Sequence, residues 1–339
     1  MNTRERFHAI MNFLPFDRLP VMEWASWWDK TIDRWHGEGL PSEWNYRENR
    51  YDICRHFGLD IYYHHWFRPL APTCPAPEHH GAPLVQSSSD YEQLRPHLFP
   101  KPDPHILEKL AGWTEEQQRG DAVVWIQLDG FFWFPRVLFG IEPHLFAFYD
   151  EPELMHRMNT DLTEWMMSLT DAVSQVCRPD FIVLAEDMSY NNGPMLSGEL
   201  FDEFLLPHYR KIIPYLRQNS SFVLVDSDGN VGPALAWFEK AGLDGLLPLE
   251  RQSGVDVAEL RERHPRMRFV GGFDKLQMNQ GEAAMRTEFE RLLPVAEKGG
   301  LIISCDHQTP PAVSIQDYRL YLRLFKEYAE TVGNFGENQ

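Results

Sequence analysis

Short apolar runs that end in acidic residues recur along the chain, and nearly all are followed by a helix-like segment. One run, Phe222–Val225, is uncharged and rich in β-branched and aromatic residues, as in a strand buried on both faces. Eight such runs in 339 residues predict an α/β fold, a (β/α)8 TIM barrel. The predicted strands are 19–23, 59–66, 121–128, 181–185, 222–225, 243–249, 268–272 and 301–304.

The same rhythm predicts a single domain over residues 1–339. An open doubly wound sheet is the alternative, but no glycine-rich dinucleotide loop follows the first predicted strand. Residues 67–112 are rich in proline and lack a strand pattern. We therefore predict an insertion after the second strand, formed as a loop or a small hairpin.

Acidic side chains follow six of the predicted strands. In a parallel barrel the carboxyl ends of the strands share one rim, where active sites lie. Turns also favour aspartate, so a single such residue is weak evidence, whereas several on one rim indicate a site. The acidic residues are Glu23, Asp129, Glu186 with Asp187, Asp226 with Asp228, Asp274 and Asp306.

Asp226 and Asp228 are the strongest candidates among these acids. Side chains alternate along a strand, so residues two apart point the same way. The two carboxylates therefore aim at one place beyond the strand, before the turn signal Gly229-Asn230. In the alternative interpretation, Asp226 shapes the turn and Asp228 caps the next helix.

Asp226, Asp228 and His307 form a candidate metal set, with Glu186 and Cys305 as further candidates. Two carboxylates and an imidazole suit Zn²⁺, Mn²⁺ or Fe²⁺ with an open position. Without a metal, repulsion between carboxylates raises at least one pKa and supplies a general acid. His307 has a structural alternative, in which it only supports the last loop.

The remaining candidates are residues for substrate binding. The aromatic run that contains Phe131 and Trp133 either lines a pocket or packs in the core. The other predicted substrate-binding residues stand at strand ends: Glu23, Trp24, Asp129, Asp274 and Lys275.

Composition excludes some partners. Fifty acidic residues against 32 basic ones give a formal charge of −18, which disfavours nucleic acid. No apolar run approaches the ~20 residues that span a bilayer, and the amino-terminal residues are polar, unlike a signal peptide. The four cysteines form no paired motif. We therefore expect a cytoplasmic protein with reduced thiols and no membrane partner.

The sequence also resembles the uroporphyrinogen decarboxylase superfamily, in particular its poorly characterised bacterial branch. The resemblance covers nearly the whole chain and implies the family's (β/α)8 barrel. The motifs that carry it are Arg4-Glu-Arg-Phe, Asp17-Arg-Leu-Pro-Val21, Glu186-Asp-Met-Ser-Tyr, Phe204-Leu-Leu-Pro-His-Tyr-Arg-Lys211, Val225-Asp-Ser-Asp-Gly-Asn230, Gly271-Gly-Phe-Asp-Lys275 and Asp306-His-Gln-Thr-Pro-Pro311.

The residues that the family's two main activities require are matched to different degrees in this sequence. Its porphyrinogen decarboxylases use arginines after the first strand, whereas the stretch 23–28 has none, and their catalytic aspartate falls near Phe67. Its cobalamin-dependent methyltransferases bind zinc through His-x-Cys after the fifth strand and a cysteine after the last. Asp226 and Asp228 stand at the first two positions and His307 at the third, which implies a harder metal site.

The resemblance therefore implies a metal-dependent methyltransferase, with zinc as the first candidate metal and a corrinoid (methylcobalamin) held by a partner protein. Its acid-base groups would be Glu186, Asp187 and His307. The alternatives are a decarboxylase acting on a small or aromatic acid, and a non-catalytic binder of a tetrapyrrole (porphyrin) or corrinoid. A small-molecule substrate is expected, and a homodimer is possible because members of the family often pair.

Overall fold

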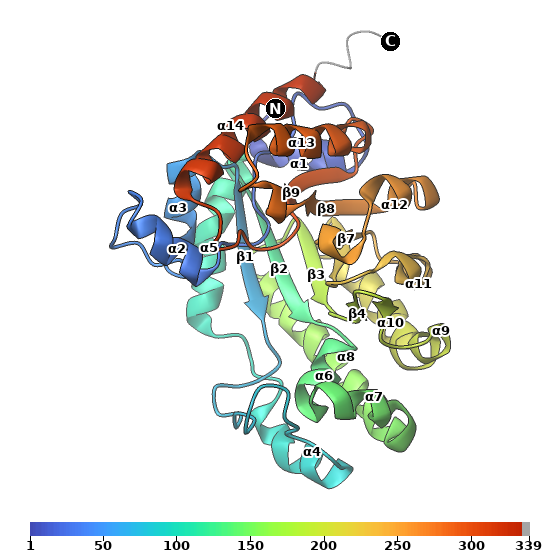
Figure 1. Ribbon diagram of the computed structural model, residues 1–339. Coiled ribbons are helices and arrows are strands. Elements are labelled where there is room, and N and C mark those ends of the chain that lie inside the picture. Colours follow the sequence, from blue (N-terminus) through green and yellow to red (C-terminus); the bar gives the residue numbers. More distant parts are fainter. Residues whose placement is uncertain (334–339) are drawn as a thin grey trace. The chain divides into compact units, whose positions relative to one another are not determined.

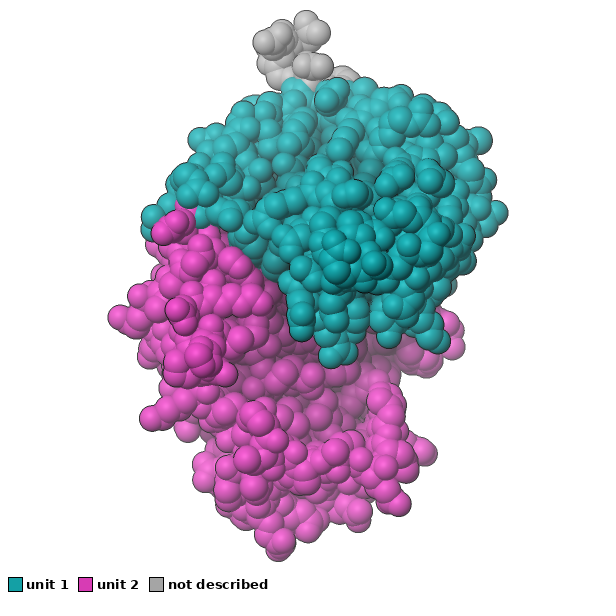
Figure 2. All heavy atoms as spheres, turned by 90° about the vertical axis from the view of Figure 1, so that its left-hand side faces the viewer, with its two compact units in different colours: residues 1–63, 116–123, 246–339 teal, residues 64–115, 124–245 magenta. Residues whose placement is uncertain are grey.

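The computed structural model describes residues 1–333, which fall into two compact units. Unit 1 comprises residues 1–63, 116–123 and the described residues from Leu246 on, and unit 2 comprises residues 64–115 and 124–245 (Figure 2). Each unit is described by itself below. The single domain over 1–339 stays a prediction.

Parallel strands form the centre of unit 2. β2 (Ala122–Asp129) lies beside β3 (Phe181–Ala185) and pairs with it (Figure 1). β3 pairs in turn with β6 (Phe222–Asp226). Every residue of β2 and β3 is buried, as the uncharged runs before Asp129 and Glu186 predict. The register places Asp129, Ala185 and Asp226 side by side. The acidic strand ends of this unit therefore lie at one edge of the sheet.

Helices of unit 2 connect and cover these strands. α8 (Pro152–Ser174) begins with proline, which suits a first helical turn, and buries an apolar stripe that packs against α10 (Leu206–Leu216). The other elements are α4 (Ser88–Leu94), η1 (Arg95–His97), α5 (Pro104–Arg119), α6 (Trp133–Phe139), α7 (Ile141–Asp150), β4 (Ser189–Tyr190), β5 (Gly193–Pro194), α9 (Gly198–Leu200), η2 (Phe201–Leu205), η3 (Gly232–Ala234) and α11 (Leu235–Ala241).

The helix predicted over 200–217 contains Pro207, which removes one backbone donor. The structure accommodates this proline with a π-helical turn, η2, directly before α10. Within this turn, the carbonyl of Phe204 accepts a hydrogen bond from Asn159 Nδ2 at 3.1 Å. The helix is therefore interrupted near the predicted residue, and Tyr209 follows on the first turns of α10.

Unit 1 contains a second parallel pair, β8 (Arg268–Phe273) with β9 (Leu301–Cys305). α13 (Glu282–Ala296) packs against α14 (Ile315–Val332), which Ser314 caps through a hydrogen bond from Asp317 N. The other elements are α1 (Thr3–Met11), α2 (Asp29–His36), α3 (Arg50–Phe57), η4 (Arg251–Ser253), α12 (Val257–Arg263) and η5 (Lys275–Gln277).

Seven strands occur in the sheet order β1-β2-β3-β6-β7-β8-β9, with β1 at Ile61–Phe67 and β7 at Gly245–Leu247. This order and the parallel pairs fit a TIM-barrel-like α/β fold. The predicted first strand, 19–23, is wrong. The side chain of Asp60 accepts from Val21 N at 2.8 Å, so this backbone donor enters no strand ladder. Closure of eight strands into a barrel stays a prediction.

The segment 67–112 is also corrected, because much of it is helical. α4 begins after Ser87, whose side chain accepts from Asp90 N, and α5 begins at Pro104, a residue suited to a first helical turn. The prolines after residue 88 therefore separate helices, whereas residues 67–87 contain no helix and agree with the predicted loop. Among residues 1–333, no helix is long and apolar enough to cross a membrane.

Candidate active site

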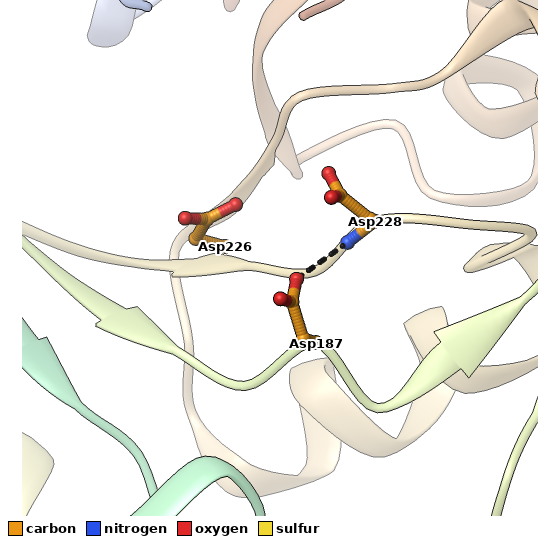
Figure 3. A group of neighbouring side chains, drawn as sticks. All are labelled: Asp187, Asp226 and Asp228. Carbon is orange, nitrogen blue, oxygen red and sulfur yellow. Dashed lines mark hydrogen bonds between the residues drawn. The ribbon is translucent and has the colours of Figure 1, made fainter. Parts of the chain in front are cut away.

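Three carboxylates meet at the carboxyl ends of β3 and β6 in unit 2. One oxygen each of Asp187, Asp226 and Asp228 lies within 4.8 Å of the others, and all three side chains are half-buried. Figure 3 shows Asp187 on the segment after β3 and the other two on β6 and the turn after it. We call these three residues the aspartate cluster. Asp226 and Asp228 were predicted to converge, and Asp187 joins them.

The strand register explains the cluster. Ala185 pairs with Asp226, and Asp226 O accepts a hydrogen bond from Glu186 N at 2.8 Å. Asp187 then adopts a left-handed backbone with φ 41°, which is uncommon for a residue other than glycine. Its Oδ1 accepts from Asp228 N at 3.3 Å, as the dashed line in Figure 3 marks. Strained backbone of this kind is found at functional sites more often than elsewhere.

The turn after Asp228 requires glycine. Gly229 has φ 81°, and a Cβ added there would lie 2.7 Å from the backbone of Ser189 and Tyr190. Ser227 is buried, and its Oγ accepts from Met188 N at 3.1 Å. One oxygen of Asp226 and one of Asp228 lie within 4.8 Å of each other, so the two carboxylates converge as their spacing predicts.

A glutamine that the sequence analysis missed orients one of the carboxylates. Gln127, a buried residue of β2, donates from Nε2 to Asp226 Oδ2 at 2.7 Å. A polar residue in an otherwise apolar strand was the available signal. This contact fixes the orientation of the Asp226 carboxylate within the aspartate cluster.

The aspartate cluster is suited to a hard cation. Three carboxylates this close repel one another unless protons or a cation compensate their charge. An all-oxygen set fits Mg²⁺, Mn²⁺ or Ca²⁺ better than a thiolate-preferring metal, and Zn²⁺ also accepts carboxylates. His307 belongs to unit 1, so its role as a ligand beside Asp226 and Asp228 stays a prediction.

Glu186, a predicted acid-base residue, is fully buried and accepts several hydrogen bonds. Its oxygens accept from Phe131 N at 2.9 Å and Phe132 N at 2.6 Å, and also from Tyr209 Oη and Trp133 N. Burial raises the pKa of Glu186 to about 7, although these donors favour the carboxylate. These contacts support a role in holding the start of α6.

Asp129 lies at the end of β2 and is fully buried. It accepts from Trp66 Nε1 at 2.8 Å and pairs with Arg68 Nε at 3.0 Å. Burial raises the pKa of Asp129 to about 6, against the opposing effect of Arg68. Substrate binding by Asp129 stays a prediction, because its oxygens already contact Trp66 and Arg68.

The two aromatic candidates in unit 2 lie in different surroundings. Phe131 is fully buried, with its ring 5.1 Å from that of Tyr209, so it packs in the core. Trp133 is half-buried, and the guanidinium of Arg136 lies 5.2 Å from its ring centre. The core interpretation therefore fits Phe131, and Trp133 remains available to a ligand.

In unit 1, Glu23 is a buried carboxyl that accepts from Ser304 Oγ at 2.7 Å and Cys305 N at 3.0 Å. Burial raises the pKa of Glu23 to about 7. Trp24 donates from Nε1 to Cys305 O at 2.8 Å, and its ring meets that of His307 edge-on at 6.1 Å. Burial lowers the pKa of His307, so its neutral form is favoured.

The other predicted residues of unit 1, Asp274 and Lys275, both contact neighbouring side chains. Lys275 Nζ lies 3.4 Å from Asp306 and 3.5 Å from Glu250. Asp274 caps η5 and accepts from Gln277 Nε2 at 2.8 Å. Substrate binding by Asp274 and Lys275 stays a prediction, because neighbouring side chains of unit 1 already pair with both.

The geometry defines an α/β protein with a parallel sheet and clustered carboxylates at its carboxyl edge. The chain belongs to the uroporphyrinogen decarboxylase (URO-D) family, whose sequence profile matches residues 138–328. This confirms the resemblance seen in the sequence. No curated protein matches the chain.

Solved structures share the fold. A methyltransferase from Methanosarcina mazei has a TM-score of 0.66 and 18% identity, over 97% of this chain and 99% of that chain. A candidate vitamin-B12 independent methionine synthase from Listeria monocytogenes has a TM-score of 0.49 and 14% identity, over 94% and 98% of the two chains. At such low identity, the first likeness shows the fold alone.

Proposed function

We propose that the protein is a metal-dependent methyltransferase of the uroporphyrinogen decarboxylase superfamily. Asp187, Asp226 and Asp228 would hold the metal, and a corrinoid on a partner protein would accept the methyl group. The observation that carries the proposal is the convergence of the three carboxylates at the carboxyl ends of adjacent parallel strands. The fold shared with the Methanosarcina mazei methyltransferase supports it.

The donor set fits a metal that acts on oxygen. A cation bound by carboxylates would polarise the oxygen of a methyl donor, such as a methoxy group or an alcohol. Gln127 orients Asp226, and the left-handed backbone of Asp187 brings its carboxylate to the same place. A metal held by three carboxylates favours substrates that bind it through oxygen. Thiol substrates suit the zinc-thiolate sites instead.

A porphyrinogen decarboxylase is disfavoured by charge. Its substrate carries many carboxylates, and the aspartate cluster together with the formal charge of −18 would repel it. A decarboxylase that acts on a small acid remains the alternative function. The products distinguish the two functions: a methyltransferase gives a methylated acceptor, and a decarboxylase gives carbon dioxide.

The first prediction concerns metal binding by the aspartate cluster. Asp228→Asn should weaken Mn²⁺ or Zn²⁺ binding at least tenfold, because one charged ligand is lost. Asp202→Asn is the matched control, since Asp202 is an exposed aspartate of unit 2 that pairs with Lys240. Calorimetric titration of the metal-free protein measures both affinities. His307→Ala tests the predicted third ligand separately.

Turnover completes this test. The wild type, loaded with metal, should methylate cob(I)alamin from a methoxylated donor, which the loss of cob(I)alamin absorbance reports. Asp228→Asn and chelator should both abolish the reaction, and Asp202→Asn should not. Carbon dioxide release that is insensitive to chelator would overturn the proposal and favour the decarboxylase.

A further inference from the structure

Two arginines of unit 2 lie on tryptophan rings beside the carboxyl edge of the sheet. The guanidinium carbon of Arg68, which follows β1, is 4.7 Å from the ring centre of Trp66. That of Arg136, in α6, is 5.2 Å from the ring centre of Trp133. The two indole rings are themselves 6.5 Å apart. The four side chains therefore form one continuous group, which we call the Arg–Trp group.

Arg68 is held in one orientation, and one edge of its guanidinium remains available. Its Nε pairs with Asp129, which is fully buried, whereas the side chain of Arg68 is 40% exposed. Asp129 also accepts from Trp66 Nε1 and so fixes the ring on which Arg68 lies. Neither Nη atom of Arg68 has a partner among residues 1–333. This leaves the two-pronged donor edge that suits a carboxylate.

Arg136 and Trp133 connect this group to the aspartate cluster. Arg136 Nη1 donates to the carbonyl oxygen of Asp187 at 2.9 Å. Trp133 Nε1 is buried and has no acceptor among residues 1–333. A buried donor without an acceptor is unfavourable, and in native proteins it is often explained by a ligand or a water. The Arg–Trp group therefore offers charge and donors next to the candidate metal ligands.

We propose that the Arg–Trp group binds the carboxylate of a small, singly charged organic acid, with Arg68 as the main contact and Arg136 as the second. This inference rests on the proposed function, since the acid would be the methyl donor. A single charge is favoured because the aspartate cluster and the formal charge of −18 oppose polyanions. The tryptophan faces favour an aromatic acid, such as a methoxybenzoate.

The second prediction tests this binding without turnover. Benzoate and 4-methoxybenzoate should bind the wild type and change its tryptophan fluorescence, whereas anisole, which lacks the carboxylate, should bind at least tenfold more weakly. Arg68→Gln should weaken benzoate binding about tenfold to a hundredfold, as expected for loss of a charge-assisted hydrogen bond. Arg68→Lys should recover only part of the affinity, because lysine lacks the planar fork.

Matched variants separate binding from folding and from metal chemistry. Arg157→Gln is the control, since Arg157 is an arginine of unit 2 that is 46% exposed and pairs with Asp161. Arg136→Gln gives an independent test if Arg68→Gln does not fold. Benzoate binding should persist in Asp228→Asn without metal, so failure of the proposed function is distinguishable from failure of this inference.

Three outcomes with the wild type and the two arginine variants would overturn the inference, and a fourth concerns the control variant. The first three are wild-type affinity for benzoate in both Arg68→Gln and Arg136→Gln, equal binding of anisole and benzoate, and binding of inorganic phosphate as tight as that of benzoate. The third outcome would assign the group to phosphate. Loss of benzoate binding in Arg157→Gln as well would show a general charge effect and would also contradict the assignment.

Discussion

At the scale of single residues, Glu23 should make stability depend on pH. Its folded pKa of about 7 lies above its ordinary value of 4.5 because it is fully buried. The neutral carboxyl is therefore favoured in the folded protein, and the stability that it contributes is complete below pH 4.5 and is lost as the pH rises through 7. The pKa difference corresponds to about 3 kcal/mol.

The third prediction follows from this loss of stability with rising pH. Glu23→Gln carries no ionisable group, so its stability relative to the wild type should increase by about 3 kcal/mol between pH 5 and pH 8. Urea unfolding of both proteins at the two pH values measures the difference. Glu43→Gln is the control, because Glu43 is exposed. A Glu23→Gln difference that is the same at both pH values would contradict the prediction.

Single residues also show how much of the site the sequence could predict. Asp226 and Asp228 followed from strand alternation, which depends only on their spacing. Asp187 was expected to act as an acid-base group, and its place in the aspartate cluster was missed. Nothing in the sequence indicates the left-handed backbone that turns its side chain toward Asp228. Arg68 and Arg136 were missed because their relation to the site depends on contacts between segments far apart in the chain, Trp66 with Trp133 and Arg136 with Asp187.

At the scale of elements, the turn after β6 positions the metal ligands. Gly229 and Gly242 both have positive φ, 81° and 91°, but only Gly229 has backbone atoms within 3 Å of an added Cβ. An alanine at either residue suffers the left-handed strain, of about 1–2 kcal/mol. Only at Gly229 does it also push against Ser189 and Tyr190 and displace the adjacent Asp228.

The fourth prediction uses this matched pair. Gly229→Ala should weaken Mn²⁺ binding at least tenfold although no ligand is removed, whereas Gly242→Ala should reduce stability by about 1–2 kcal/mol and leave metal affinity unchanged. Thermal unfolding and calorimetric titration give the two quantities. Equal metal affinity in the two variants would show that the turn does not position Asp228.

Elements were predicted well where periodicity is strong and poorly where side chains compete with the backbone. Strands β2, β3 and β6 were recognisable as uncharged runs that, in β2 and β6, end in an aspartate. The expected strand at 19–23 failed because Asp60, distant in sequence, binds Val21 N. Helices α4 and α5 were missed because the many prolines of 67–112 were taken as loop signals, although proline is also common in a first helical turn.

At the scale of the whole molecule, the excess of 50 acidic over 32 basic residues creates a negative field. This field attracts a divalent cation to the aspartate cluster and repels an anion from the Arg–Trp group. Salt screens both effects, because the Debye length falls from about 10 Å at 0.1 M to about 3 Å at 1 M. The two ligands should therefore respond to salt in opposite directions.

The fifth prediction is this opposite response. Raising the salt concentration should weaken Mn²⁺ binding and strengthen benzoate binding, because the attraction of one and the repulsion of the other are both screened. Tetramethylammonium chloride is the appropriate salt, since its bulky cation cannot occupy a carboxylate site. Calorimetric titrations of each ligand at low and high salt measure the two slopes. If both ligands weaken together, the local carboxylates and arginines control binding, and the net charge of the molecule does not.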